Sequence, residues 1–227
     1  MSKKSSSTSG LDGIIAGESA ISTVGLGFGL NYRGYSIEDL AQHGSFEEIA
    51  YLLLLGNLPT LPELQAFRHS IAEKRTLPSA LKTVLELMPA SSHPMEVMRT
   101  IASFLGVIEP ETNTYGQLEV AIRLIAVFGP AICYWHHFAT GGKRIETNTD
   151  PEDSIAENFL KLLLLIPSPP PLLVRTVDVS LILYAEHDFN ASTFSARVVV
   201  STKSDIYSGI VAGIGALRGN LHGGANE

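Results

Sequence analysis

Apolar residues recur along most of this chain at intervals of three to four positions, the spacing typical of amphipathic or buried helices. The periodicity is nearly continuous from residue 46 onward, and prolines fall between the periodic stretches, where they begin or end helices. The pattern predicts helices over residues 46–56, 62–76, 79–88, 94–107, 116–138, 152–165, 172–187, 192–201 and 204–218. A mainly α architecture follows.

The N-terminal part has a different pattern. Between Leu11 and Ile37, small and β-branched residues alternate with glycine, and turn signals stand at Gly25, Gly27 and Gly29. This alternation predicts a short β hairpin. Residues 1–10 are mostly Ser, Thr and Lys without an apolar run, so we expect a disordered tail rather than a secretory signal.

Composition narrows the classes of function. With 227 residues, 45% of them hydrophobic, the chain can bury a large core. The 16 Lys and Arg against 23 Asp and Glu give a net charge of −7, which excludes the basic footprint of a nucleic-acid-binding protein. Charged residues such as Arg123, Lys161 and Arg218 interrupt the longest apolar stretches, so we expect no membrane-spanning segment.

The single cysteine, Cys133, lies in an apolar run and is interpreted as a buried small hydrophobic residue rather than a nucleophile. A lone cysteine suits a reducing compartment, and we expect a cytoplasmic protein. The adjacent His136 and His137 point about 100 degrees apart on a helix and are poorly placed to share a metal. His93, just before Pro94, is expected to cap a turn, and no Cys and His spacing indicates zinc.

Polar residues gather where the predicted helix 172–187 ends and the helix 192–201 begins. Asn190 or Ser192 is a natural N-cap, and His187 can donate or accept a hydrogen bond. The free N–H groups at the start of the second helix suit a carboxylate, so the junction fits a small anionic molecule. The competing interpretation, which is the commoner one for such junctions, is that Asn190 only caps and His187 packs against a neighbouring helix.

A second group of candidate residues lies at the end of the chain. The helix predicted over 204–218 is rich in Gly, Ala and Ser, which indicates either tight helix packing or a subunit interface. His222 follows it, and Gly223 and Gly224 leave space around the imidazole for a ligand. The alternative is a structural histidine followed by glycines that only cap the helix.

Four blocks together carry a resemblance to a known family. They are Leu-Asn-Tyr-Arg-Gly-Tyr-Ser-Ile at 30–37, Ser-His-Pro-Met-Glu-Val-Met-Arg-Thr at 92–100, Tyr-Ala-Glu-His-Asp-Phe-Asn-Ala-Ser-Thr at 184–193 and Leu-His-Gly-Gly-Ala-Asn-Glu at 221–227. Their residues and order resemble the citrate synthase family, most closely its bacterial-type 2-methylcitrate synthases.

The resemblance implies a mostly helical homodimer that condenses propionyl-CoA or acetyl-CoA with oxaloacetate and then hydrolyses the thioester. It implies no metal and no cofactor, because acyl-CoA is a substrate. By similarity, His222 would hold the thioester carbonyl and stabilise the enol, while His187 and, less firmly, Asn190 would bind oxaloacetate. Such a reaction needs a carboxylate base and a hydrogen-bond donor for the developing enolate oxygen.

Several parts of the family pattern have no match within these 227 residues. They are the second histidine, the catalytic aspartate, the carboxylate-binding arginines and the CoA loop, which family members carry in a smaller C-terminal domain. We therefore expect residues 11–227 to form an incomplete large domain that is inactive by itself. Asn220 also replaces a common proline. The alternative is a non-catalytic truncated paralogue that acts as a helical dimerisation protein.

Overall fold

The N-terminal part of the fold is a small antiparallel sheet. The structure is a computed structural model that describes residues 17–25 and 29–226. Strands β1 (Ser22–Gly25), β2 (Gly29–Tyr32) and β3 (Tyr35–Ser36) pair in the order β1-β2-β3. The predicted hairpin is confirmed and gains a third strand, although the turn signal at Gly27 and the tail 1–10 lie outside the described residues.

The tight turn between β2 and β3 explains the third strand. Arg33 and Gly34 both have positive φ, 50° and 90°, which is the backbone twist that joins two antiparallel strands through a two-residue loop. Ser36 then begins a helix that the periodicity did not reveal, α1 (Ile37–His43), in which the Ser36 hydroxyl accepts a hydrogen bond from the Asp39 amide. A serine before an acidic first turn is a helix-start signal, and this signal was missed.

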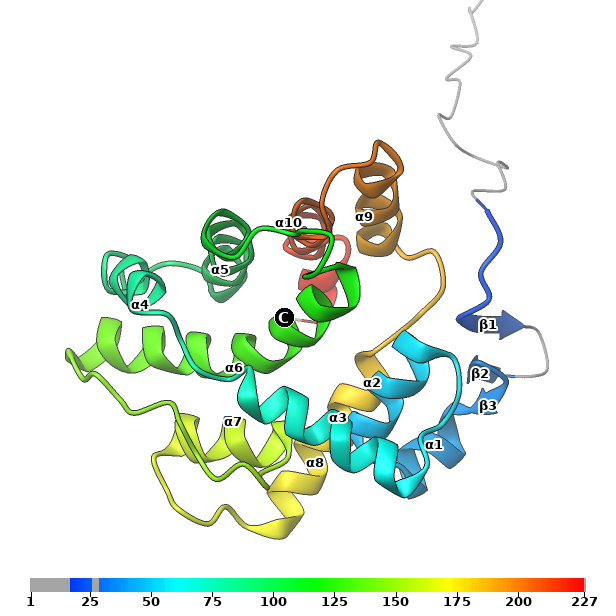
Figure 1. Ribbon diagram of the computed structural model, residues 1–227, viewed down its shortest axis with the longest axis horizontal. Helices are drawn as coiled ribbons and strands as arrows, with labels where there is room; N and C mark the ends of the chain where they lie inside the picture. Colours follow the sequence, from blue (N-terminus) through cyan, green and yellow to red (C-terminus); the bar gives the residue numbers. More distant parts are fainter. Residues whose placement is uncertain (1–16, 26–28, 227) are drawn as a thin grey trace, which may run out of the picture.

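Every predicted helix is present in the described part of the chain, with small differences at the ends (Figure 1). Helix α8 ends at Tyr184 and not at residue 187, so His187 lies on a connecting segment. The helices after α1 are α2 (Phe46–Leu55), α3 (Leu61–Glu73), α4 (Ser79–Glu86), α5 (Pro94–Ile108), α6 (Gln117–Gly141), α7 (Ile155–Leu164), α8 (Pro171–Tyr184), α9 (Ala191–Ser201) and α10 (Ile206–Leu217).

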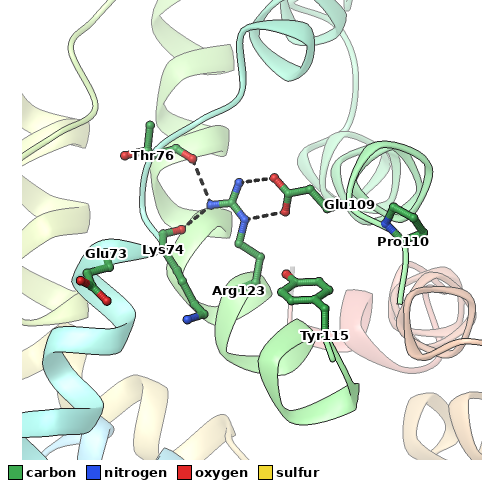
Figure 2. A pocket seen from close by; sticks show the side chains of 7 residues that line it. All are labelled: Glu73, Lys74, Thr76, Glu109, Pro110, Tyr115 and Arg123. Atoms are coloured by element: carbon green, nitrogen blue, oxygen red, sulfur yellow. Dashed lines mark hydrogen bonds and ion pairs between the residues drawn. The ribbon is translucent and has the colours of Figure 1, made fainter. Parts of the chain in front are cut away.

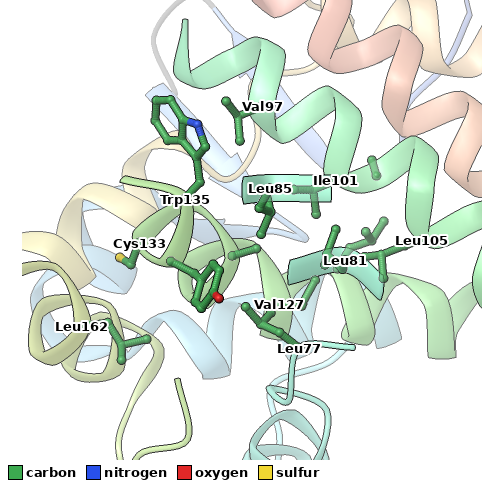
Figure 3. Packing of buried hydrophobic residues seen from close by; sticks show 14 of the residues in the cluster. Leu77, Leu81, Leu85, Val97, Ile101, Leu105, Val127, Cys133, Trp135 and Leu162 are labelled. Atoms are coloured by element: carbon green, nitrogen blue, oxygen red, sulfur yellow. The ribbon is translucent and has the colours of Figure 1, made fainter. Parts of the chain in front are cut away.

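Helix α6 is the central element of the fold. It packs against α3, α4, α5, α7 and α10, and its buried residues join a large hydrophobic cluster (Figure 3). By length and composition α6 is apolar enough to cross a membrane, so Arg123 does not interrupt this apolar stretch as expected. Because 61% of its apolar window is buried inside the protein, α6 serves as a core helix.

The charge that interrupts α6 is itself buried. The guanidinium of Arg123 donates to both carboxylate oxygens of Glu109 at 2.8 Å and to the carbonyl oxygens of Lys74 and Thr76 (Figure 2). A buried charge is tolerated when an opposite charge and hydrogen bonds satisfy it. Arg123 therefore ties the end of α5 and the segment after α3 to the central helix.

Small residues on α10 allow close contact with α9 and α5. A Cβ atom at Gly209 would lie 2.7 Å from Cγ1 of Val200, and one at Gly213 would lie 3.4 Å from the carbonyl oxygen of Ser192. Of the two interpretations of this helix, tight packing is the one that this face shows. The contact brings the end of α10 beside the start of α9.

Three further residues that the sequence singled out, Cys133, His93 and His137, have structural positions in the fold. Cys133 is 1% exposed, and burial raises the pKa of its thiol to about 12, as expected for a buried small hydrophobic residue. His93 is the N-cap of α5, where its Nδ1 accepts a hydrogen bond from the Met95 amide. The Nε2 of His137 lies 2.9 Å from the carbonyl oxygen of Leu162.

Candidate functional site

The segment that joins α8 to α9 is fastened to the N-terminal sheet. The hydroxyl of the fully buried Tyr32, on β2, lies 3.0 Å from the carbonyl oxygens of both Ile182 and Glu186, which share its single proton. It also accepts a hydrogen bond from the Glu186 amide at 3.3 Å. Burial raises the pKa of Tyr32, so the hydroxyl stays protonated and able to donate. The sheet thus fixes the backbone just before His187.

A second contact from the sheet holds the backbone on the other side of His187. The hydroxyl of Ser22, which is buried on β1, donates to the Glu186 carboxylate at 3.1 Å and accepts from the Asp188 amide at 3.0 Å. Asp188 has a φ of 55°, a left-handed conformation that Asp and Asn adopt more readily than most residues. His187 therefore projects from a turn whose two flanking residues are both anchored.

Asn190 begins α9. Its Oδ1 accepts hydrogen bonds from the Thr193 amide at 2.9 Å and from the Ser192 hydroxyl at 2.6 Å. The capping interpretation is confirmed for this residue. It does not remove Asn190 from the candidate site, because the residue also lines the pocket described below.

His222 reaches the same helix end from a distant part of the sequence. After α10 the chain turns, and the His222 amide donates to the Gly219 carbonyl oxygen at 2.9 Å. Gly223 opens the short 3-10 helix η1 (Gly223–Asn226), where a Cβ atom would collide with the carbonyl oxygen of Leu217, so the turn needs glycine. The turn places the imidazole of His222 against Ser192.

The contact with Ser192 bears on the tautomer of the imidazole. The Ser192 amide donates to Nε2 of His222 at 3.3 Å, and the Ser192 hydroxyl oxygen lies 3.0 Å from the same nitrogen. An amide can only donate, so the Ser192 amide favours the tautomer of a neutral His222 in which Nε2 accepts and Nδ1 carries the proton. The ring thereby keeps one N–H donor that α9 does not use.

All three predicted site residues line one pocket of about 550 Å³. They come from two segments more than 30 positions apart, and helix α9 connects them through Ser192. Sequence reasoning missed Ser192 as the partner of His222, although it belongs to one of the quoted blocks. It also missed the apolar wall of the pocket. The lining consists of Leu183, Tyr184, Ala185, Glu186, His187, Asn190, Ser192, Thr193, Leu217, His222 and Gly223.

Comparison with known proteins identifies the family. Residues 10–227 match the family model described as citrate synthase, C-terminal domain. The chain belongs to the citrate synthase family. A 2-methylcitrate synthase of Shewanella oneidensis is 54% identical to this family member, over 96% of the chain and 58% of the relative. A citrate synthase of Mycolicibacterium smegmatis is 42% identical, with the same coverage of both proteins.

Solved structures of this family have the same fold. A citrate synthase from Thermotoga maritima superposes with a TM-score of 0.84 at 36% identity and covers 96% of this chain. A ternary complex of the Thermoplasma acidophilum citrate synthase with carboxymethyl coenzyme A and oxaloacetate gives 0.85 at 30% identity, over 95% of this chain. The chain spans 57% of the length of each. The predicted family and the mainly α fold are confirmed.

Proposed function

We propose that this chain supplies the substrate-holding wall for the condensation of propionyl-CoA, or acetyl-CoA, with oxaloacetate, which yields 2-methylcitrate, or citrate, and free CoA. The observation that supports it is the convergence of His187, Asn190 and His222 in one pocket. Membership of the citrate synthase family and the 54% identity to a 2-methylcitrate synthase favour the propionyl substrate.

In the proposed reaction His222 stabilises the enol. Loss of a proton from the acyl α-carbon places negative charge on the thioester oxygen, and a fixed N–H donor aimed at that oxygen lowers the barrier. Nδ1–H of His222 is such a donor, because Nε2 is held by the Ser192 amide. The enol carbon then forms a bond with the ketone carbon of oxaloacetate, and water releases CoA from the thioester.

We assign His187 and Asn190 to the oxaloacetate side of the pocket. Oxaloacetate is a dianion, and the partial positive charge at the start of α9, which Asn190 caps, favours a carboxylate there. The proposed chemistry assigns polarisation of the carbonyl groups to side chains, so it calls for no cofactor and no metal. Acyl-CoA takes part as a substrate.

The carboxylate base is assigned to a residue outside this wall. Among the residues that the structure describes, Glu186 is the acidic residue lining the pocket, and its carboxylate accepts a hydrogen bond from Ser22. We therefore expect the 227-residue chain to release no CoA when it is mixed with oxaloacetate and propionyl-CoA. A thiol reagent that reports free CoA is a direct assay, and turnover above the protein-free rate would refute the assignment.

The role of His222 is tested in a protein that extends this chain to the length of its relatives. We expect His222→Ala to lower kcat by about two powers of ten or more, the loss typical of a transition-state donor. His69→Ala is the matched control, because His69 is an exposed residue on α3 whose imidazole lies 3.2 Å from the Glu73 carboxylate, away from the candidate site. A kcat of His222→Ala equal to that of the control would remove His222 from the mechanism.

The acyl preference is measured in the same extended protein. One methylene in an apolar pocket changes binding by about 1–3 kcal/mol, so we expect a higher kcat/KM for propionyl-CoA than for acetyl-CoA. Equal or reversed values would assign the chain to citrate formation.

We also propose that the chain acts as a homodimer in the cytoplasm. Large apolar side chains such as Leu172 and Val198 are 80% and 50% exposed, and we propose that a second subunit covers them. Sedimentation equilibrium measures the oligomeric state.

Titration with oxaloacetate distinguishes a chain that holds substrate from a protein that only dimerises. A substrate-holding chain should bind oxaloacetate, and His187→Ala should weaken that binding; a protein that only dimerises should show neither effect.

A further inference from the structure

The imidazole of His187 depends on its backbone for its position. Helix α8 ends at Tyr184 and α9 begins after its N-cap, Asn190, so His187 lies outside the regular turns of both helices. In the described part of the chain its imidazole makes no hydrogen bond or ion pair, whereas the imidazole of His222 contacts Ser192. The direction of the His187 ring is therefore set by the segment that carries it.

One side chain holds that segment on both sides of His187. The Ser22 hydroxyl donates to the Glu186 carboxylate at 3.1 Å and accepts from the Asp188 amide at 3.0 Å. Because Ser22 is only 5% exposed, water does not readily replace its hydroxyl. Loss of this one hydroxyl would release both residues that flank His187.

The turn around His187 has a conformation that needs such support. Asp188 has a φ of 55°, in the left-handed region, and a non-glycine residue keeps this conformation where its surroundings hold it. The N-terminal segment supports the next position as well, because a Cβ atom at Gly17 would lie 3.1 Å from the ring of Phe189. The residues on both sides of the imidazole are thus held by the segment that contains Ser22.

We propose that Ser22 is a positioning residue for the binding of oxaloacetate. Its hydroxyl fixes the turn that places His187 in the wall of the pocket of about 550 Å³, and Ser22 is not among the described residues that line this pocket. Hydrogen bonds weaken steeply when their distance or angle changes, so a displaced turn weakens the contact between the imidazole and its substrate. The inference rests on the proposed assignment of His187 to oxaloacetate.

The test is kinetic and uses the extended protein with Ser22→Ala, which removes the hydroxyl alone. We expect the KM for oxaloacetate to rise about three- to tenfold, the loss typical of one neutral hydrogen bond, while the KM for propionyl-CoA changes less than about twofold. Thr23→Val is the matched control, because Thr23 is an exposed residue of the same strand and this change also removes a hydroxyl. A smaller fraction of folded protein would lower the apparent kcat and leave both KM values unchanged.

A double-mutant cycle shows whether Ser22 acts through His187. We expect Ser22→Ala to add nothing to the rise in KM that His187→Ala causes, because two residues that act through one contact have non-additive effects. Ser22→Thr keeps a hydroxyl and should restore most of the lost affinity. Ser22→Cys fills nearly the same space with a weaker donor and acceptor, so it should give an intermediate KM even if the Ala variant folds poorly.

The outcomes separate this proposal from the proposed function. If His187→Ala leaves the KM for oxaloacetate unchanged, the assignment of His187 is wrong and the role of Ser22 is refuted with it. If His187→Ala raises the KM but Ser22→Ala matches Thr23→Val, the assignment of His187 stands and the positioning role is overturned. Additive effects in the double-mutant cycle would overturn the positioning role in the same way.

Discussion

The hydroxyl of Tyr32 makes a sharp test of how the sheet supports the candidate site. Tyr32 is fully buried, and its hydroxyl donates to carbonyl oxygens at the end of α8 while it accepts from the Glu186 amide. Tyr32→Phe keeps the ring that packs in the core and removes only the oxygen. The Glu186 carbonyl and amide, which directly precede His187, then lose this partner.

The size of the effect follows from the groups left behind. A buried polar group that loses its hydrogen-bond partner costs about 1–3 kcal/mol, and we expect Tyr32→Phe to lower the free energy of unfolding by that amount. A protein of this length loses about 2–4 °C of Tm for each kcal/mol. We also expect faster amide hydrogen exchange at Glu186 and Asp188, because the first loses its acceptor and the second lies in the loosened turn.

Urea unfolding followed by circular dichroism measures the change, with Tyr35→Phe as the matched control. Tyr35 lies on β3 and is 44% exposed, so removing its hydroxyl should alter the free energy of unfolding by less than about 0.5 kcal/mol. If the two variants unfold at the same urea concentration, the Tyr32 hydroxyl does not hold the junction and the reasoning is wrong.

Three further predictions test the packing, the buried thiol and the partner of His222. Gly209→Val should destabilise the protein by about 1–3 kcal/mol through overpacking against α9. Gly215→Ala should not, because a Cβ atom at Gly215 meets open space. Equal melting temperatures for the two variants would contradict this prediction. Cys133 keeps its proton in the folded state up to a pKa of about 12 but ionises near 9 when unfolded, so stability should fall as pH rises through that window. Cys133→Ala should lose less stability over the same window in urea titrations, and an identical loss would exclude the thiol. In the extended protein, Ser192→Ala removes the hydroxyl and keeps the backbone amide, so it should lower kcat only about two- to tenfold, the loss typical of one neutral hydrogen bond. A decrease as large as that of His222→Ala would show that the amide alone does not orient the imidazole ring.

Local patterns predicted the helices because helix formation depends on neighbouring residues. The periodic apolar positions located α2 to α10, and of the two candidate caps, Asn190 and Ser192, the structure shows Asn190. The short α1 escaped notice because seven residues give too few repeats to show the period. The apolar length of α6 was underestimated because Arg123 was taken as an interruption, whereas Glu109 neutralises it in the interior.

The sequence by itself determined the family, the helical fold and the identity of His187, Asn190 and His222 as candidates, since these depend on residue types at fixed positions. Only the tertiary structure decided what surrounds them. Ser22 reaches Glu186 across 164 positions, and His222 meets Ser192 across 30. Contacts of this kind depend on how α10 packs beside α9 and where the sheet meets the end of α8. No local pattern encodes that geometry, because it arises when distant elements bury their apolar faces together.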